Sequence, residues 1–192
     1  MLPILGKPMV AWSIEAAIRS ELFERVIVSS DFEEILEISK KYGAEARRRT
    51  SQLSQDWSSV NEVVNSILGE EIELGRNYDE LFLLYATAPL RTSDDLLAMA
   101  EILENEVKAK AVIATTKFVH YPYQALTVTT DNELKPMWPA LVRKRATSLP
   151  NFVVGNASTY AIKVTEFQKH LDFFLPSGMY GHYMPFWRSV DI

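Results

Sequence analysis

Short apolar runs alternate with amphipathic helical segments over the first 116 residues, and this alternation constrains the fold more than any other feature. Strands that alternate with helices build βαβ units, in which the sheet is mostly parallel and covered by helices. The sequence therefore predicts an α/β domain with a mostly parallel sheet. The expected strands are 25–30, 81–85 and 111–115, and the expected helices are 8–20, 32–41, 59–73 and 93–106. Asp31 and Ser93 are the expected caps of two of these helices.

The pattern changes after residue 116. Prolines and aromatic residues become frequent, residues 126–129 alternate like a hairpin strand, and Asp131-Asn132 is typical of a turn. Residues 160–162 resemble a strand that returns to the sheet, and 165–171 a short helix. We interpret 1–192 as a single domain in which 120–152 is an inserted arm.

The amino-acid composition limits the kinds of partner and of site that the protein can have. The formal net charge of -5 argues against nucleic acid as the main partner. The absence of cysteine excludes disulfides and thiolate metal sites. No apolar run approaches the roughly 20 residues of a membrane span, and the N-terminus has no signal-peptide pattern. These features fit a cytoplasmic protein.

Ligands of open α/β sheets bind at the carboxyl ends of the strands. This rule selects residues 29–31, 85–91 and 115–120. In the second segment Thr87 offers a hydroxyl group and Arg91 a charge, although a strand end followed by a helix cap, with Arg91 in solvent, explains the segment equally simply.

Basic clusters and one carboxylate add further candidates. Residues 47–49 are three arginines, which are usually solvated but could hold a phosphate or a base edge. The basic cluster 143–145 suits an anionic substrate such as a carboxylated sugar, and a solvated arm is an equally good explanation. Asp191 follows Ser189 and Val190, and a carboxylate at a strand end can bind Mg²⁺, but a lone aspartate near a chain end is more often a surface residue.

Taken in order, seven segments resemble the cytidylyltransferases that activate sialic acid and related nonulosonic acids. The correspondence covers nearly the whole chain and implies a Rossmann-like nucleotidyltransferase domain with an inserted dimerisation arm. The segments are 5–17 (the first helix), 26–31 ("VSTD"), 49–59 (R-P-x-x-L-x-x-D and a serine-rich helix start), 84–91 ("QPTSPLR"), 145–150 (R-x-x-x-L-P), 156–160 ("NGAIY") and 190–192 ("IDID").

The resemblance implies that CTP and an acidic nine-carbon sugar react to give a CMP-sugar and pyrophosphate. Catalysis there consists of positioning and of charge neutralisation by Mg²⁺ and basic groups. By analogy, CTP would be bound by Arg49, Ser58 and Ser59, with a less direct contribution from Lys7. The sugar would be bound by Tyr85, Thr87, Gln124, Arg145 and Asn156, with Arg145 as a candidate partner of its carboxylate. Asp191 would be the catalytic metal ligand.

Details within the motifs favour the pseudaminic acid branch of the family. Tyr85 stands where the sialic-acid enzymes carry glutamine, and Gln124 stands where they usually carry lysine. The segment 155–158 is less similar to that branch. The sequence thus favours pseudaminic acid and leaves sialic and legionaminic acids open.

The chain also departs from the family pattern. The family begins with a strand and a loop rich in glycine, lysine and arginine that holds the triphosphate, and its second aspartate would be residue 193. Neither is present in these 192 residues, so we expect that this polypeptide alone does not turn over CTP. A non-catalytic nucleotide-sugar-binding or scaffold protein is the alternative from another class. An enzyme for 3-deoxy-manno-octulosonic acid is a third reading, but it would carry an acidic metal ligand within residues 87–89.

Family members are usually dimers joined through the arm. The arm here contains Trp138, Pro139, Leu141 and Phe152. An arm of this length with several apolar residues needs something to cover it, and we therefore expect a homodimer.

Overall fold

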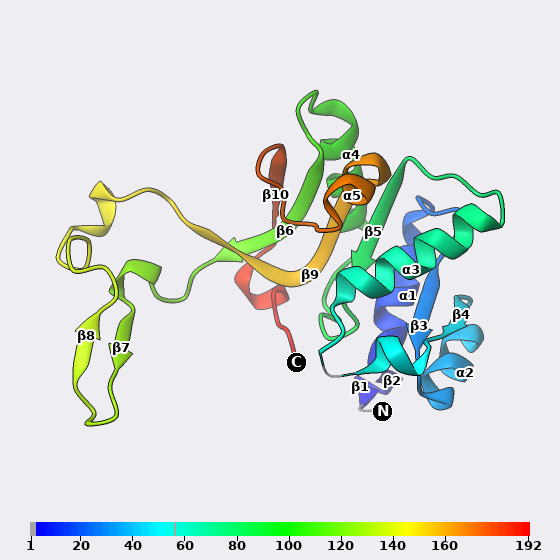
Figure 1. The fold of residues 1–192 in the computed structure, drawn as a ribbon, viewed down its shortest axis with the longest axis horizontal. Helices are drawn as coiled ribbons and strands as arrows, with labels where there is room; N and C mark the ends of the chain where they lie inside the picture. Colours follow the sequence, from blue (N-terminus) through cyan, green and yellow to red (C-terminus); the bar gives the residue numbers. More distant parts are fainter. Residues whose placement is uncertain (1–2, 56) are drawn as a thin grey trace.

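Four strands form the central sheet in the order β10-β6-β9-β5. The computed structural model describes residues 3–55 and 57–192 (Figure 1). The four strands are β5 (Glu80–Leu84), β6 (Ala111–Lys117), β9 (Val153–Lys163) and β10 (Met179–Tyr183). β10 pairs with β6 in parallel, whereas β9 is antiparallel to both β6 and β5. The expectation of a mostly parallel sheet is therefore not confirmed: the sheet is mixed, because the chain returns from the arm as β9 and enters between two strands of the opposite direction.

A second, two-stranded sheet consists of β3 (Ile27–Ser30) and β4 (Glu45–Arg48), which are parallel and joined by helix α2 (Glu33–Lys41). Arg47 and Arg48, two of the three consecutive arginines, thus belong to strand β4. Helix α1 (Met9–Ser20) packs against both sheets: its Val10 and Ile14 contact β3, and Ala16 and Ala17 pack in a cluster with β5.

Helices cover both faces of the central sheet (Figure 1). Helix α4 (Ser93–Asn105) packs on one face, and helices α3 (Val60–Glu73) and α5 (Val164–His170) pack on the other. Neighbouring strand residues face opposite layers, as the period of two requires. The α4 layer contains Met99, Leu103, Val112 and Ala161. The opposite layer contains Leu68, Ala111, Ile162 and Phe167.

Two helix starts differ by one residue from the expected caps. Helix α4 is capped by Thr92, not Ser93, and Thr92 forms a capping box with Asp95. Helix α2 has Phe32 at its N-cap, without a side-chain hydrogen bond, so Asp31 does not cap it. Ser59 caps α3 through a capping box with Glu62. Propensity marks the ends of helices, but it places the cap only to within a residue or two.

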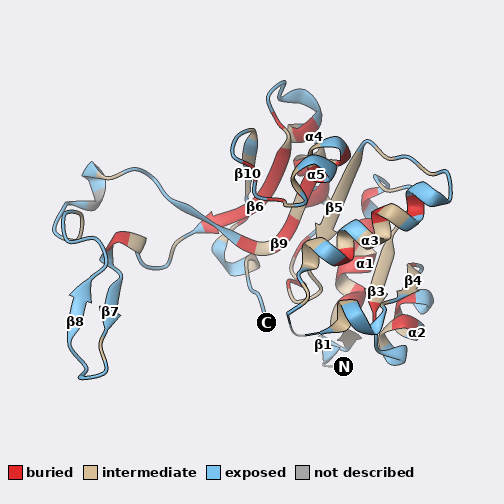
Figure 2. Ribbon diagram, in the orientation of Figure 1, coloured by how far each residue is buried: buried red, intermediate tan, exposed pale blue. Residues whose placement is uncertain are grey.

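Residues between β6 and β9 form an arm that extends away from the body (Figure 1). The expected hairpin is present as β7 (Leu126–Val128) and β8 (Leu134–Pro136), and Asn132 adopts a positive φ of 63° in its turn. Two short 3₁₀ helices flank the hairpin, at Pro122–Gln124 and Ala146–Ser148. Most of the arm is exposed (Figure 2).

The remaining elements are short. β1 (Pro3–Ile4) and β2 (Lys7–Pro8) form a hairpin, η1 (Ser51–Ser54) follows β4, and η4 (Phe186–Arg188) follows β10. None of the helices in the described part of the chain has the length and apolar character needed to cross a membrane.

Candidate functional site

The last residues of the chain return to the end of β5. The backbone N–H of Ile192 donates a hydrogen bond to the carbonyl oxygen of Thr87 at 3.1 Å. β5, β6 and β10 share one direction, so their carboxyl ends lie at the same edge of the sheet. Asp191 is thereby held next to the strand end that carries Thr87. Ligands of open α/β sheets bind at such carboxyl ends of strands.

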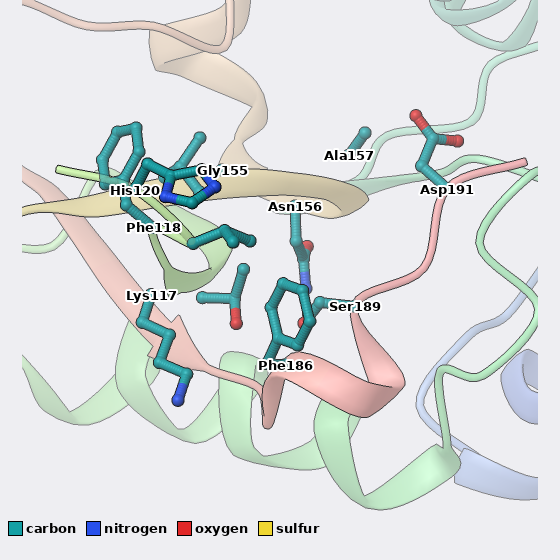
Figure 3. A pocket seen from close by; sticks show the side chains of 12 residues that line it. Lys117, Phe118, His120, Gly155, Asn156, Ala157, Phe186, Ser189 and Asp191 are labelled. Atoms are coloured by element: carbon teal, nitrogen blue, oxygen red, sulfur yellow. The ribbon is translucent and has the colours of Figure 1, made fainter. Parts of the chain in front are cut away.

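A pocket of about 480 Å³ opens at this edge (Figure 3). Its walls come from the end of β6, the first half of β9 and the segment after β10. Of the residues predicted from the sequence, it contains Asn156 and Asp191. The lining residues are Thr116, Lys117, Phe118, Val119, His120, Val154, Gly155, Asn156, Ala157, Phe186, Ser189 and Asp191.

Asn156 fixes one wall of the pocket. Its side chain is 6% exposed, and its amide nitrogen donates to Ser189 Oγ at 3.0 Å and lies 3.2 Å from Met184 Sδ. Its amide oxygen accepts a hydrogen bond from the Ser158 N–H at 3.1 Å. The amide is thus already engaged with the protein, which favours a role in holding β9 and the C-terminal segment together.

β9 is irregular where it borders the pocket. Its register with β6 shifts between Ile113 and Thr115, and Ala157 has a φ of 53°. A positive φ is unfavourable for a residue with a Cβ atom. Bulges often occur beside active sites, where they redirect side chains. Here the irregularity lies between Asn156, which faces Ser189, and Ser158.

Tyr85 and Tyr160 form an aromatic pair beside Asp191. Their ring centroids lie 6.0 Å apart with edge-to-face geometry. Burial raises the pKa of both phenols, and the negative charge of Asp191 raises both pKa values further. Both hydroxyl groups therefore stay protonated at neutral pH and can donate hydrogen bonds to an anionic ligand.

Arg91 is buried, contrary to the simple reading that placed it in solvent. It is 4% exposed and donates hydrogen bonds to the Tyr85 carbonyl oxygen at 2.8 Å, Ser13 Oγ at 2.9 Å, Thr159 Oγ1 at 2.7 Å and the Ser158 carbonyl oxygen. Burial lowers its pKa to about 10, so the guanidinium remains charged at neutral pH. Its donors bind the protein itself, so Arg91 supports the strand end instead of offering its charge to a ligand.

The residues predicted to bind CTP lie outside this pocket, after β4 of the second sheet and at the starts of α1 and α3. Arg49 follows β4, and its guanidinium donates to the Ser29 carbonyl oxygen at 2.8 Å. Arg49 also lines a small hollow of about 20 Å³ near the ends of β3 and β4. Ser58 Oγ donates to the Gln52 carbonyl oxygen at 2.9 Å, and Ser59 caps α3. The Lys7 ammonium lies 2.7 Å from the Glu15 carboxylate and above the ring of Trp12.

Gln124 and Arg145 lie on the arm, and both are exposed. Neither lines the pocket of its own chain. Figure 1 shows why: the arm leads away from the body before β9 returns. The structure therefore separates these two predicted sugar ligands from Asn156 and Asp191.

Asp191 suits a magnesium ligand in its chemistry. It is exposed at the pocket, and no described residue forms a hydrogen bond or ion pair with its carboxylate. Mg²⁺ commonly binds one or two carboxylates and completes its shell with water and substrate phosphates. A dedicated cage is absent, since residues 3–55 and 57–192 contain no group of three or more candidate metal-binding side chains.

Several pocket residues were not identified from the sequence. Lys117 and His120 come from the segment after β6 that the strand-end rule selected, but nothing in the sequence distinguished them from their neighbours. Phe186 belongs to η4, and no expected element included it. Lys117 and Asp191 lie on opposite sides of the pocket (Figure 3).

The sequence of the chain was compared with those of known proteins and protein families. The Cytidylyltransferase family profile matches residues 1–173. The pseudaminic acid cytidylyltransferase of Campylobacter jejuni subsp. jejuni serotype O:2 is 41% identical over 128 residues, which are 65% of this chain and 53% of that protein. The N-acylneuraminate cytidylyltransferase of Escherichia coli O18:K1:H7 is 32% identical over 116 residues, 60% of this chain and 27% of that protein. The chain spans about half the length of the first of these relatives and about a quarter of the second.

Solved structures share the fold at low sequence identity. A CMP:2-keto-3-deoxy-manno-octonic acid synthetase in complex with CTP superposes with a TM-score of 0.65 at 14% identity, covering 96% of this chain and 82% of its own. The 4-diphosphocytidyl-2C-methyl-D-erythritol synthase of Anaerococcus prevotii gives 0.66 at 14% identity, covering 100% and 85%. With the family profile matching most of its length, the chain belongs to the cytidylyltransferase family.

Proposed function

We propose that the protein transfers CMP from CTP to a nonulosonic acid with release of pyrophosphate, and that pseudaminic acid is the favoured acceptor. One observation carries the proposal: the tether from Ile192 to Thr87 brings Asp191 to the β5 end, and Asp191 and Asn156 line the same pocket. The similarity to a pseudaminic acid cytidylyltransferase supports the choice of acceptor.

In the proposed reaction the anomeric hydroxyl oxygen of the sugar attacks the α-phosphorus of CTP. The bond from that phosphorus to the bridging oxygen breaks, pyrophosphate leaves with this oxygen, and the hydroxyl proton is lost to solvent. The protein contributes position and charge, as in other phosphoryl-type transfers. Tyr85 and Tyr160 are protonated because burial raises the pKa of both phenols, and their hydroxyl groups would donate hydrogen bonds to the anionic substrates. Lys117 and His120 would draw the sugar carboxylate to the pocket.

Asp191 is the proposed ligand of Mg²⁺. When bound, the ion would neutralise charge on the phosphates of CTP. Arg49, with Ser58 and Ser59, is the proposed binding region for the cytosine, and the hollow beside Arg49 lies at the ends of β3 and β4. Lys7 would contribute less directly, since its ammonium is paired with Glu15.

We also propose a homodimer joined through the arm. Apolar side chains of the arm are exposed in the single chain: Leu126, Val128, Leu134, Met137, Trp138 and Phe152. A second copy would cover them, as exposed apolar patches generally require. Arg145 and Gln124 would then serve the pocket of the partner, which explains why neither lines its own. The proposed reaction belongs in the cytoplasm, where CTP is available.

Product analysis tests the proposed function. The protein encoded by the complete reading frame that contains these residues is incubated with CTP, Mg²⁺ and, in turn, pseudaminic, legionaminic and N-acetylneuraminic acids. We expect pyrophosphate and a CMP-sugar, with the highest kcat/KM for pseudaminic acid. Binding of CTP without product from any acid would favour the non-catalytic alternative.

A further inference from the structure

Asp95 carries more hydrogen bonds than a helix cap needs. It is 3% exposed, and its Oδ2 accepts hydrogen bonds from the N–H and the hydroxyl group of Thr92, each at 2.9 Å. The contact with the Thr92 N–H, together with the hydrogen bond from the Asp95 N–H to Thr92 Oγ1 at 3.4 Å, forms the capping box of α4. Both oxygens of the carboxylate also bind elements outside the helix.

Two such elements reach Asp95. Arg188 of η4 donates from both terminal nitrogens, from Nη1 to Oδ2 at 2.5 Å and from Nη2 to Oδ1 at 3.1 Å. His182 of β10 places Nε2 3.0 Å from Oδ1. A guanidinium that binds a carboxylate through two parallel contacts fixes orientation as well as distance. Burial tends to raise the pKa of Asp95, but the hydrogen bonds from His182, Arg188 and Thr92 outweigh it and hold the pKa well below its usual range.

Arg188 belongs to the segment that forms one wall of the pocket. This segment, residues 185–192, carries Phe186, Ser189 and Asp191, all of which line the pocket. Beyond Arg188 its ties to the body include two hydrogen bonds, one from Asn156 to Ser189 Oγ at 3.0 Å and one from Ile192 to Thr87 at 3.1 Å. The contact between Arg188 and Asp95 is an ion pair, and the Asp95 carboxylate is almost fully buried.

We propose that Asp95 is a positioning residue, which holds segment 185–192 through Arg188 and thereby presents Asp191 and Phe186 to the pocket. The inference rests on the proposed function for the role of Asp191, whereas the structural part stands on its own. Asp95 itself does not line the pocket, so its effect passes through Arg188. A cap alone would stabilise α4 and leave segment 185–192 unaffected.

Hydrogen exchange of segment 185–192, followed by mass spectrometry, tests the structural part. The variants are Asp95→Asn, which keeps the shape but removes the charge, and Arg188→Met, which leaves the cap of α4 intact. Arg188 is 20% exposed as a side chain, so the second variant is the less disruptive of the two. We expect exchange in 185–192 at least about tenfold faster in both variants, with α3 and β3 unchanged.

Glu71→Gln is the matched control. Glu71 is also a buried carboxylate, 2% exposed, and it binds Arg47 and Arg76, far along the chain from the pocket. We expect this variant to loosen α3 and β4 but not 185–192. Unchanged exchange of 185–192 in Arg188→Met, or equal acceleration in Glu71→Gln, would overturn the proposal.

Kinetics of the complete protein test the link to Asp191. In Arg188→Met we expect the Mg²⁺ concentration for half-maximal rate to rise at least about fivefold, and kcat to fall, while KM for CTP changes little; Arg188→Lys should recover part of the loss. If the wild-type protein has no activity, the proposed function is wrong. The hydrogen-exchange measurement then still tests whether Asp95 holds segment 185–192 in place. Faster exchange with an unchanged Mg²⁺ requirement would overturn the positioning role.

Discussion

Arg91 donates a hydrogen bond to the carbonyl oxygen of Tyr85 at 2.8 Å, which places a buried cation directly behind the strand end that borders the candidate site. The same guanidinium binds Ser13 on α1 and Thr159 on β9. One side chain thus joins a helix, the end of β5 and the inserted strand. Arg91 thus helps to anchor the backbone at Tyr85.

Replacement of Arg91 by methionine should destabilise the fold strongly. The variant leaves several buried oxygen atoms without their donor, so we expect a loss of about 3 kcal/mol in the free energy of unfolding. Urea denaturation measures it. Arg19→Met is the control, because the Arg19 side chain is 69% exposed and its pair with Glu15 should be worth less than about 1 kcal/mol. Equal losses in the two variants would contradict this account of Arg91.

Replacement of Ala157 by glycine should stabilise the protein, although glycine usually destabilises a strand. The φ of 53° at Ala157 is unfavourable for alanine, and glycine removes the clash. Relief of this strain should be worth about 1–2 kcal/mol. The greater entropy of glycine in the unfolded chain offsets part of that gain, so we expect a net stabilisation of about 0.5 kcal/mol for Ala157→Gly. Ala161→Gly, at a fully buried position of the same strand, should instead cost about 1 kcal/mol. Thermal unfolding of both variants reveals whether the signs differ; a loss of stability in Ala157→Gly would show that the backbone there is not strained.

Asp95 should make stability depend on acid pH. Its pKa in the folded protein lies below that in the unfolded chain, so the unfolded state takes up the proton first as the pH falls. The contribution of Asp95 is fully present above about pH 5 and is lost progressively below about pH 4. Unfolding free energies measured from pH 7 to pH 3 should fall less steeply in Asp95→Asn than in the wild type. Parallel curves would mean that Asp95 titrates normally.

Mixing of subunits tests whether the arm serves the partner. Arg145→Ala and Asp191→Asn should each be nearly inactive alone. If Arg145 acts in the site of the partner, random mixing makes about half the dimers mixed, each with one intact site, so about a quarter of the wild-type rate should return. If Arg145 acts in its own chain, every site in the mixture carries a substitution and no activity returns. Mixing Asp191→Asn with Asp191→Ala provides the negative control.

The sequence predicted the elements better than their arrangement. The strands at 81–85 and 111–115, the hairpin near 126–129 and the helices are all present, because apolar periodicity and turn residues are local signals. The direction and place of β9 were not predictable in this way. The pairing of Leu83 with Tyr160 joins residues far apart in the chain, and no local pattern records that β9 separates β5 from β6.

The pocket was predictable in part. The motif resemblance led to Asp191 and Asn156, and both residues line the pocket, whereas the strand-end rule selected the segment that contributes Thr116 to His120. The same reasoning treated Arg91 as a possible ligand and overlooked Asp95. Both side chains are buried because of partners that lie far away in sequence, such as Thr159 for Arg91 and Arg188 for Asp95. These contacts become visible only when α1, α4, β9 and η4 are packed.

The decisive measurement is a crystal structure of the complete protein with the proposed CMP-sugar product bound. We expect the sugar in the pocket bordered by Lys117, Asn156 and Asp191, and the cytosine towards Arg49. A product bound at another surface, with this pocket empty, would contradict the claim that the edge formed by β5, β6 and the segment after β10 is where the transfer takes place.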